Sequence, residues 1–488
     1  MEFISPLWPA YPELFLLGAV CVILVADLFV ADENRIVSYG LTLAALAGTV
    51  VVIWANAPVR AVYTFSNMFV GDLMGSVLKL FVCIAVMMVL VYSRPYASLR
   101  GMFRGEFFAL ALFSTLGMFV MISANHLLLL YLGLELMTLS LYAMVALQRD
   151  SATATEAAMK YFVLGALASG MLLYGMSMLY GATGTLDIGE LATVIGEGGV
   201  LGTVLLLGLV FVVAGLGFKL GAVPFHMWIP DVYHGAPTAV TLFVASAPKI
   251  AAFAFVIRLL GQALGAEIVM DEWRQMLMVM AVLSLVIGNV TAIVQSNLKR
   301  MLAYSTISHM GFVLLGILSG DENGYSAAMF YVLTYVFMTL GAFGMILLLS
   351  RAGFEAENLD DFKGLNQRSA WYAFLMLLLM FSMVGIPPTV GFYAKLAVLQ
   401  ALLGLGDVGI ALAVIAILFS AVGAFYYLRV VKLMYFDAPE DVAPIAPRAD
   451  VKVLMSLNGL AMLYFGIVPG PLMALCLYSI QASVTGAY

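Results

Sequence analysis

Charged side chains are scarce in this chain. Only 10% of its 488 residues are charged, 64% are hydrophobic, and the mean hydropathy is +1.06. A water-soluble protein needs a much larger polar surface, so the composition excludes a soluble globular fold. The formal net charge of −6 also has the wrong sign for binding nucleic-acid phosphates, and we expect no nucleic-acid partner.

Cysteine and the common cofactor motifs are nearly absent. The three cysteines, Cys21, Cys83 and Cys476, lie in apolar runs without metal-ligand spacing, so disulfides, zinc and iron–sulfur sites are not expected. There is no Walker A pattern, and GLGFKLG lacks the spacing and the preceding strand of a dinucleotide site. No paired histidines indicate haem. We therefore expect this chain to bind no metal or cofactor and to take its driving energy from elsewhere.

Long apolar runs are what the sequence does contain. Runs of about 20 apolar residues, the length that spans a bilayer, recur throughout the chain. The N-terminus has no basic region and no small-residue cleavage site, which favours a retained first span over a signal peptide. We predict one all-α polytopic integral domain with about 14 transmembrane helices. They centre on residues 12–30, 36–55, 68–92, 105–123, 126–148, 157–180, 200–228, 238–260, 274–296, 300–318, 326–350, 370–403, 407–431 and 451–484.

The basic residues between these spans predict the orientation. If the N-terminus lies outside, the cytoplasmic connections hold 14 basic residues, and the opposite side holds three, Arg60, Arg258 and Arg274. Lysine and arginine concentrate on the cytoplasmic side of membrane proteins. We therefore expect both termini on the outer side. Asp27 and Asp72 lie near span ends and are expected at the membrane interface.

The stretch 215–241, GLGFKLGAVPFHMWIPDVYHGAPTAVT, places a charge inside an apolar run. Gly221 and Pro224 follow Lys219 at once and interrupt the helix. Freed backbone groups are tolerated in a membrane only where protein or water surrounds them. An ionisable group beside such a break therefore indicates an ion path. The alternative is a lysine that snorkels to the interface.

The predicted twelfth span is interrupted in the same way, at Gly385, Pro387 and Pro388, and carries Lys395. It lies five spans after the seventh. Because five is odd, a five-span repeat must insert its second copy upside down. Matching broken helices are typical of inverted-repeat transporters with a site near the midplane. We predict repeats formed by spans 4–8 and 9–13.

Five lysines remain inside apolar runs once the basic residues of loops and span ends are set aside. They are Lys79, Lys160, Lys219, Lys249 and Lys395, and Glu135 is the one carboxylate near the centre of a span. At an effective dielectric of about 20, opposite charges about 4 Å apart attract by about 4 kcal/mol. A Glu135–Lys219 pair would hold a proton on the lysine and release it when pulled apart.

Histidines could bridge such groups, because imidazole titrates near neutral pH. We assign a relay role to His226 and His309, with hydrogen-bonded packing as the alternative. Lys160 lies close enough to its span's start to snorkel. Lys79 has no evident partner and stays unassigned.

Three segments carry a resemblance to a known family. KLGAVPFHMWIPDVYHGAPTAVT, NLKRMLAYSTISHMGF from Asn297 and DDFKGL from Asp360 resemble the antiporter-like subunits of respiratory complex I, a superfamily that includes Mrp-type cation/proton antiporters. The chain is more similar to the N branch of this superfamily than to the L or M branches. The segments PDVYHGAPT and GIPPTVGFYAKL and the chain length carry this similarity. The M branch carries a glutamate at the position that Lys395 occupies here, so Lys395 also favours the N branch.

The resemblance implies proton translocation by a membrane-arm subunit, with Glu135, Lys160, Lys219, Lys249 and Lys395 as the proton path. NADH, FMN, iron–sulfur clusters and quinone would then belong to other subunits. It further implies a bacterial inner membrane location, an M-type neighbour, small K and J subunits, and lipids as partners.

We divide the chain into spans 1–3 (1–104), a first repeat (105–262), a second repeat (263–432) and a cytoplasmic loop with the last span (433–488). Two alternatives remain at this stage. The chain could be an Mrp-type cation/proton antiporter without a redox link. It could also be a structural subunit whose buried charges only hold helices together.

Overall fold

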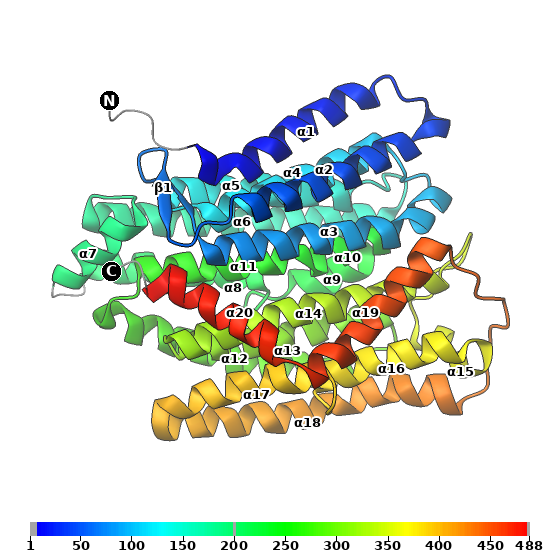
Figure 1. Cartoon of the computed structure of the whole chain (residues 1–488). Coiled ribbons are helices and arrows are strands. Elements are labelled where there is room, and N and C mark those ends of the chain that lie inside the picture. Colours follow the sequence, from blue (N-terminus) through cyan, green and yellow to red (C-terminus); the bar gives the residue numbers. More distant parts are fainter. Residues whose placement is uncertain (1–6, 199–201, 486–488) are drawn as a thin grey trace.

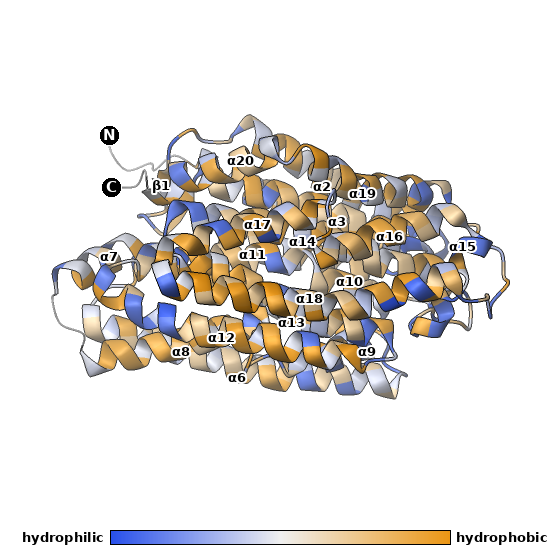
Figure 2. Cartoon of the chain, turned by 90° about the horizontal axis from the view of Figure 1, so that it is seen from below, coloured by the Kyte–Doolittle hydropathy of each residue, from blue (hydrophilic) through white to orange (hydrophobic). Residues whose placement is uncertain are grey.

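The computed structural model describes residues 7–198 and 202–485, which form a bundle of nearly parallel helices (Figure 1). In this part of the chain, 13 helices are long and apolar enough to cross a membrane. The longest, Val390–Phe436, contains the second half of the predicted twelfth span and the whole thirteenth, and the shorter apolar helix Ala370–Val384 forms the first half of the twelfth. Hydrophobic residues follow the length of the helices, and hydrophilic ones gather at the two ends beside α7 and α15 (Figure 2). The chain is therefore a multi-pass membrane protein, as predicted.

The N-terminal unit contains a short hairpin that the sequence did not predict. Its elements are η1 (Trp8–Ala10), α1 (Tyr11–Asp27), η2 (Asp32–Asn34), α2 (Ile36–Ala55), β1 (Val62–Thr64), β2 (Phe69–Gly71) and α3 (Leu73–Leu99). The strands pair antiparallel, with Tyr63 opposite Val70. The third span therefore begins after the predicted residue 68, where Asp72 caps α3 by accepting a 2.8 Å hydrogen bond from the Gly75 N–H.

The first predicted repeat corresponds to α4 (Gly105–Ser123), α5 (Leu127–Val145), α6 (Ala152–Thr183), α7 (Ile188–Glu197), α8 (Thr203–Leu220), α9 (Trp228–Gly235), α10 (Thr238–Ala245), α11 (Ala247–Val256) and the π-helical η3 (Ile257–Ala263). The eighth span is thus not one regular helix. It turns at Ser246, immediately before Ala247 and Pro248, because a proline inside a helix removes a backbone hydrogen bond.

The second predicted repeat corresponds to α12 (Glu267–Ile293), α13 (Leu298–Leu318), α14 (Glu322–Leu349), η4 (Leu359–Phe362), α15 (Leu365–Arg368), α16 (Ala370–Val384), α17 (Val390–Leu402), η5 (Leu403–Leu405) and α18 (Gly406–Phe436). The last span is divided at Pro469 into α19 (Ala449–Ile467) and α20 (Gly470–Ile480), followed by η6 (Gln481–Thr485).

Both predicted helix breaks are present and have the same hydrogen bonds. α8 ends at Gly221 with φ +79°, and α16 ends at Gly385 with φ +89°. The N–H of the residue after each glycine bonds a carbonyl five residues back, Ala222 to Gly217 and Ile386 to Phe381. This is the Schellman arrangement, which glycine supports best. The chain reaches the first break from the α7 end and the second from the α15 end (Figure 1), so the two breaks run in opposite directions.

The centre of the bundle lies around the eighth, tenth and eleventh spans. The most apolar windows of Thr238–Ala263, Leu298–Leu318 and Glu322–Leu349 are 100%, 94% and 89% buried, against 28% for Val390–Phe436. Helices that are hydrophobic all round and surrounded by protein form the core of a bundle. Polar groups on these three spans are therefore shielded from lipid.

The loops at the α15 end are joined by ion pairs. Arg351 donates a 2.7 Å hydrogen bond to Asp441, and this bond holds the pKa of the Asp441 carboxyl at about 2. Arg368 also contacts Asp441, at 3.1 Å. The segment after α18 is thereby tied to the loop that follows α14.

Glycine allows α4 and α5 to approach closely. A Cβ at Gly117 would lie 2.7 Å from the Gly133 carbonyl and overlap the Met137 N–H. We expect Gly117→Ala to lower the free energy of unfolding by about 1–3 kcal/mol, the usual cost of overpacking. The yield of folded protein and its midpoint of thermal aggregation in detergent measure this. Gly170→Ala is the control, because no other atom lies within 4 Å of a Cβ there; equal losses from both variants would contradict the account.

Candidate functional site

Lys219 lies on the last turn of α8, directly before the first break. Its Nζ donates a 3.1 Å hydrogen bond to the Ser169 hydroxyl of α6. The ammonium also lies 5.7 Å from the centre of the Phe218 ring. A cation at a helix C-terminus is stabilised by the helix dipole. The broken helix therefore provides part of the environment that a charged Lys219 requires.

Lys249 comes from α11 and points at the same break. It is 2% exposed, and its Nζ donates a 2.9 Å hydrogen bond to the carbonyl of Leu220. That carbonyl is the last of α8, next to the left-handed Gly221. The Trp228 ring centre lies 5.4 Å from the same ammonium. The first break thus acts on both lysines. The dipole of α8 faces Lys219, and the Leu220 carbonyl accepts a hydrogen bond from Lys249.

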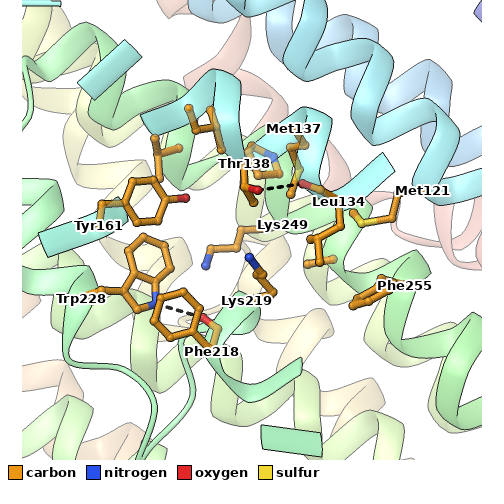
Figure 3. Close-up of a pocket in the computed structure, with 14 residues that line it drawn as sticks. Met121, Leu134, Met137, Thr138, Tyr161, Phe218, Lys219, Trp228, Lys249 and Phe255 are labelled. Atoms are coloured by element: carbon orange, nitrogen blue, oxygen red, sulfur yellow. Dashed lines mark hydrogen bonds between the residues drawn. The ribbon is translucent and has the colours of Figure 1, made fainter. Parts of the chain in front are cut away.

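A small cavity of about 20 Å³ lies between the two lysines. Figure 3 shows both ammonium nitrogens directed into the space enclosed by Tyr161, Phe218 and Trp228. Such a volume holds about one water molecule. Two ammonium groups that face one water repel each other, which favours one charged and one neutral lysine. The geometry therefore suits a proton shared between Lys219 and Lys249.

Glu135 on α5 lies near this cavity without pairing directly. Its neighbours Leu134 and Thr138 line the cavity, and its carboxylate is close enough to act electrostatically on Lys219. No ion pair joins Glu135 to Lys219 in the described part of the chain, and Glu135 Oε1 is buried without a hydrogen-bond partner there. A buried acceptor without a partner is costly. The pair that the sequence suggested is therefore not in direct contact among the described residues.

Lys395 on α17 occupies the second break. Its Nζ donates to the carbonyls of Met383 (3.1 Å) and Val384 (2.7 Å) and to the Ser420 hydroxyl (2.7 Å). Val384 immediately precedes Gly385, as Leu220 precedes Gly221. At each break a lysine therefore binds the last carbonyl of the helix that ends there, Lys249 from the following span and Lys395 from the second half of the same interrupted span. By this contact Lys395 corresponds to Lys249, whereas the sequence had matched it with Lys219.

Lys160 is placed differently from the other lysines. Its side chain is 43% exposed and forms 2.8 Å ion pairs with Glu156 and Asp231. Asp231 also contacts Arg300 of α13, at 3.0 Å. The geometry agrees with the snorkelling alternative, although the next residue, Tyr161, lines the cavity between Lys219 and Lys249.

The two candidate histidines have contrasting surroundings. His226 lies in the first break and is partly exposed, and its ring has no side-chain hydrogen-bond partner among the described residues. His309 is 4% exposed, and its Nδ1 and Nε2 lie 2.7 Å from the Tyr331 hydroxyl and 3.0 Å from the Tyr427 hydroxyl. Only His309 is thus linked to further groups that can carry a proton.

Sequence reasoning missed two buried ion pairs outside these breaks. Lys79 pairs with Glu13 of α1 at 2.5 Å, with side chains 4% and 8% exposed. Asp72 pairs with Arg258 at 2.7 Å, each 1% exposed. Asp72 caps α3 and Arg258 lies in η3, so both stand at span ends, but protein covers both residues, which the sequence did not predict. Partners so far apart in sequence leave no local pattern that could have revealed them.

Lys299 is also buried, although the sequence suggested an exposed position in a loop. Its side chain is 3% exposed, and its Nζ donates a 2.9 Å hydrogen bond to the Ala236 carbonyl between α9 and α10. Glu355 and Glu357 lie 3.7 and 3.8 Å away. Among residues 7–198 and 202–485, no group of three or more His, Cys, Asp or Glu side chains is placed to hold a metal ion.

Comparison with known proteins identifies the family of this chain. Residues 124–420 match the family described as NADH:quinone oxidoreductase/Mrp antiporter, transmembrane. The NADH-quinone oxidoreductase subunit N of Thiobacillus denitrificans is 66% identical over 97% of this chain and 98% of that protein. The subunit N of Nitrosomonas europaea is 62% identical over 99% of this chain and all of that protein.

Solved structures have the same fold. A chain of respiratory complex I from Thermus thermophilus with bound aureothin is 30% identical, with a TM-score of 0.81 over 96% of this chain and 99% of that one. A chain of the Mrp complex from Dietzia has a TM-score of 0.85 over 99% of this chain and 98% of that one. Because the Dietzia chain is only 21% identical, it shows the fold alone. The chain therefore belongs to the family of antiporter-like N subunits of NADH-quinone oxidoreductases.

Proposed function

We propose that this chain moves protons across the membrane through its row of buried ionisable residues. It is a proton-translocating membrane-arm subunit of an NADH-quinone oxidoreductase, and an antiporter-like translocase. The observation that supports the mechanism best is the repeated contact at the two breaks, where Lys249 binds the Leu220 carbonyl and Lys395 binds the Val384 carbonyl. A lysine that exchanges between such a carbonyl and water can take up and release a proton.

The proposed route uses the residues in order across the two repeats. Protons reach Lys219, whose charge is controlled by the distance to Glu135, and pass through the one-water cavity to Lys249. They then cross to Lys395 and leave on the outer side. Lys160 lies where the route begins, next in the sequence to the cavity-lining Tyr161. His226 and His309 serve as relays. Residues 105–262 and 263–432 act as the two inverted repeats, with 1–104 and 433–488 packed against them.

The partners follow from the family. The chain assembles with other subunits of the complex, and we propose that these include an M-type antiporter-like subunit and the small K and J subunits. NADH, FMN, iron–sulfur clusters and quinone are bound by other subunits, whose redox chemistry drives this one. We place the chain in a bacterial inner membrane with both termini outside, because the predicted basic connections then face the cytoplasm.

Glu135→Ala tests the proposed switch in the whole complex. We expect NADH-driven proton pumping to fall at least fivefold, because Lys219 loses the carboxylate that stabilises its charged form. Blue-native electrophoresis with an in-gel NADH dehydrogenase stain checks that the chain still runs in the large NADH-oxidising band.

Glu106→Ala is the matched control, since Glu106 is an exposed glutamate in the first turn of α4. Full pumping by an assembled Glu135→Ala complex would refute the switch. A wild-type chain that ran alone, without NADH-oxidising activity, would refute membership of the complex.

A further inference from the structure

A closed set of polar side chains surrounds His309 inside the second repeat. Both ring nitrogens of the imidazole face hydroxyl groups, Tyr331 of α14 on one side and Tyr427 of α18 on the other. All three side chains are at most 4% exposed. The lysine contacts that support the proposed function do not involve these tyrosines.

The Tyr427 hydroxyl has a second partner. It lies 2.5 Å from the Ser305 hydroxyl, and either oxygen can be the donor. Ser305 is one helical turn before His309 on α13 and about two turns after Leu298, where that helix begins. A hydroxyl has one donor and two acceptor sites, so it can accept a proton from one neighbour while it gives its own to another. Tyr427 thus bridges His309 to a group nearer the membrane face beside Lys299.

The other end of the set lies beside Lys395. Phe312, one turn after His309, stacks on Tyr331 with ring centres 5.6 Å apart and an angle of 11°. The Lys395 ammonium lies 5.1 Å from the Phe312 ring centre. A pocket of about 290 Å³ next to Lys395 is lined by Phe312, Ser420 and Ala424, and Ala424 is one turn before Tyr427 on α18. The pocket adjoins both the Lys395 ammonium and the Phe312 ring that stacks on Tyr331.

We propose that Tyr427 is a proton-relay residue that joins Lys395, through His309, to Ser305 and the membrane face where α13 begins. The inference rests on the proposed function and adds a separate branch for the second repeat. A proton taken up on one nitrogen of His309 displaces the proton on the other nitrogen to the Tyr427 oxygen. The hydroxyl proton of Tyr427 passes to the Ser305 oxygen, and the Ser305 hydroxyl proton passes to a water molecule that enters from that membrane face. Each group of the relay ends neutral, and the proton that Lys395 gives up reaches Nδ1 of His309 through water and the Tyr331 hydroxyl.

Tyr427→Phe tests the relay, because it removes one oxygen and keeps the ring. In the assembled complex we expect protons pumped per NADH oxidised to fall at least threefold, and the solvent isotope effect on pumping to change. Tyr92→Phe is the matched control. Tyr92 is also a buried tyrosine, 1% exposed, with its hydroxyl near Asn458 rather than His309. A structural role alone would leave the isotope effect unchanged.

Two further variants keep the inference falsifiable. Ser305→Ala removes the next group in the chain, and we expect the same threefold loss; it decides the question if Tyr427→Phe does not assemble. The double variant should pump no more slowly than the slower single variant, because both residues serve one path. Additive losses would overturn the relay. If Tyr427→Phe and Ser305→Ala pump normally while Lys219→Ala does not, the relay is wrong and the proposed function stands. If all three pump normally, the proposed function itself fails.

Discussion

Lys219→Ala is expected to lower NADH-driven proton pumping at least tenfold in an assembled complex. The ammonium faces a cavity that holds about one water, and the Lys249 ammonium faces the same cavity. Without Lys219, the remaining lysine loses the neighbour with which it would share a proton. An alanine offers no titratable group in its place. Acidification-sensitive dye quenching in membrane vesicles, normalised to NADH oxidation, measures the loss.

The matched control for this variant is Lys432→Ala. Lys432 is a lysine at the end of α18 that pairs with Asp437 at 2.6 Å, and its side chain is 62% exposed. Exposed ion pairs of this kind contribute about 0–1 kcal/mol, so pumping and assembly should stay near the wild-type level. Equal losses from both variants would indicate a general effect of removing a lysine and would contradict a specific role for Lys219.

Arg258→Met is expected to destabilise the fold by about 3–5 kcal/mol, the usual cost of leaving one charge of a buried pair uncompensated. Asp72 is 1% exposed and would remain in the core beside a neutral side chain. Arg258 also donates to the Ile122 carbonyl (3.2 Å) and to Gln262 (3.1 Å), so it joins α3, α4 and η3. The amount of assembled complex on blue-native gels and its rate of thermal inactivation report the effect.

Combining Arg258→Met with Asp72→Asn distinguishes charge from packing. The asparagine oxygen can still accept from the Gly75 N–H and cap α3, while the isolated charge is gone. We therefore expect the double variant to regain at least half of the lost complex. A double variant as unstable as Arg258→Met would mean that the packing of the arginine stem, rather than an uncompensated charge, dominates.

The spans and both breaks could be predicted from the sequence because their signals are local. A run of 20 apolar residues spans a bilayer on its own. A glycine such as Gly221 or a proline such as Pro388 favours the end of a helix whatever its surroundings. The hairpin at 62–71 could not be separated from α3, since Phe69–Gly71 is an apolar segment that continues into the next apolar run. The division of the eighth span had a signal in Pro248 that the apolar run concealed.

The residues of the candidate site could be predicted from the sequence, but the contacts between them could not. Buried lysines stand out in apolar runs, which identified Lys219, Lys249 and Lys395. Which carbonyl each lysine binds depends on helix packing, so the correspondence between Lys249 and Lys395 required the structure. The same holds for Lys79, whose partner Glu13 lies on another helix.

The number of protons pumped per NADH oxidised by an assembled Lys219→Ala complex tests the central claim most directly. Purified complex reconstituted in proteoliposomes, with the NADH-oxidising activity of each preparation as the denominator, gives this ratio. Our account predicts a ratio clearly below that of the wild-type complex, because a buried group of the proposed path is missing. An unchanged ratio would show that protons cross without Lys219 and would contradict the proposed path.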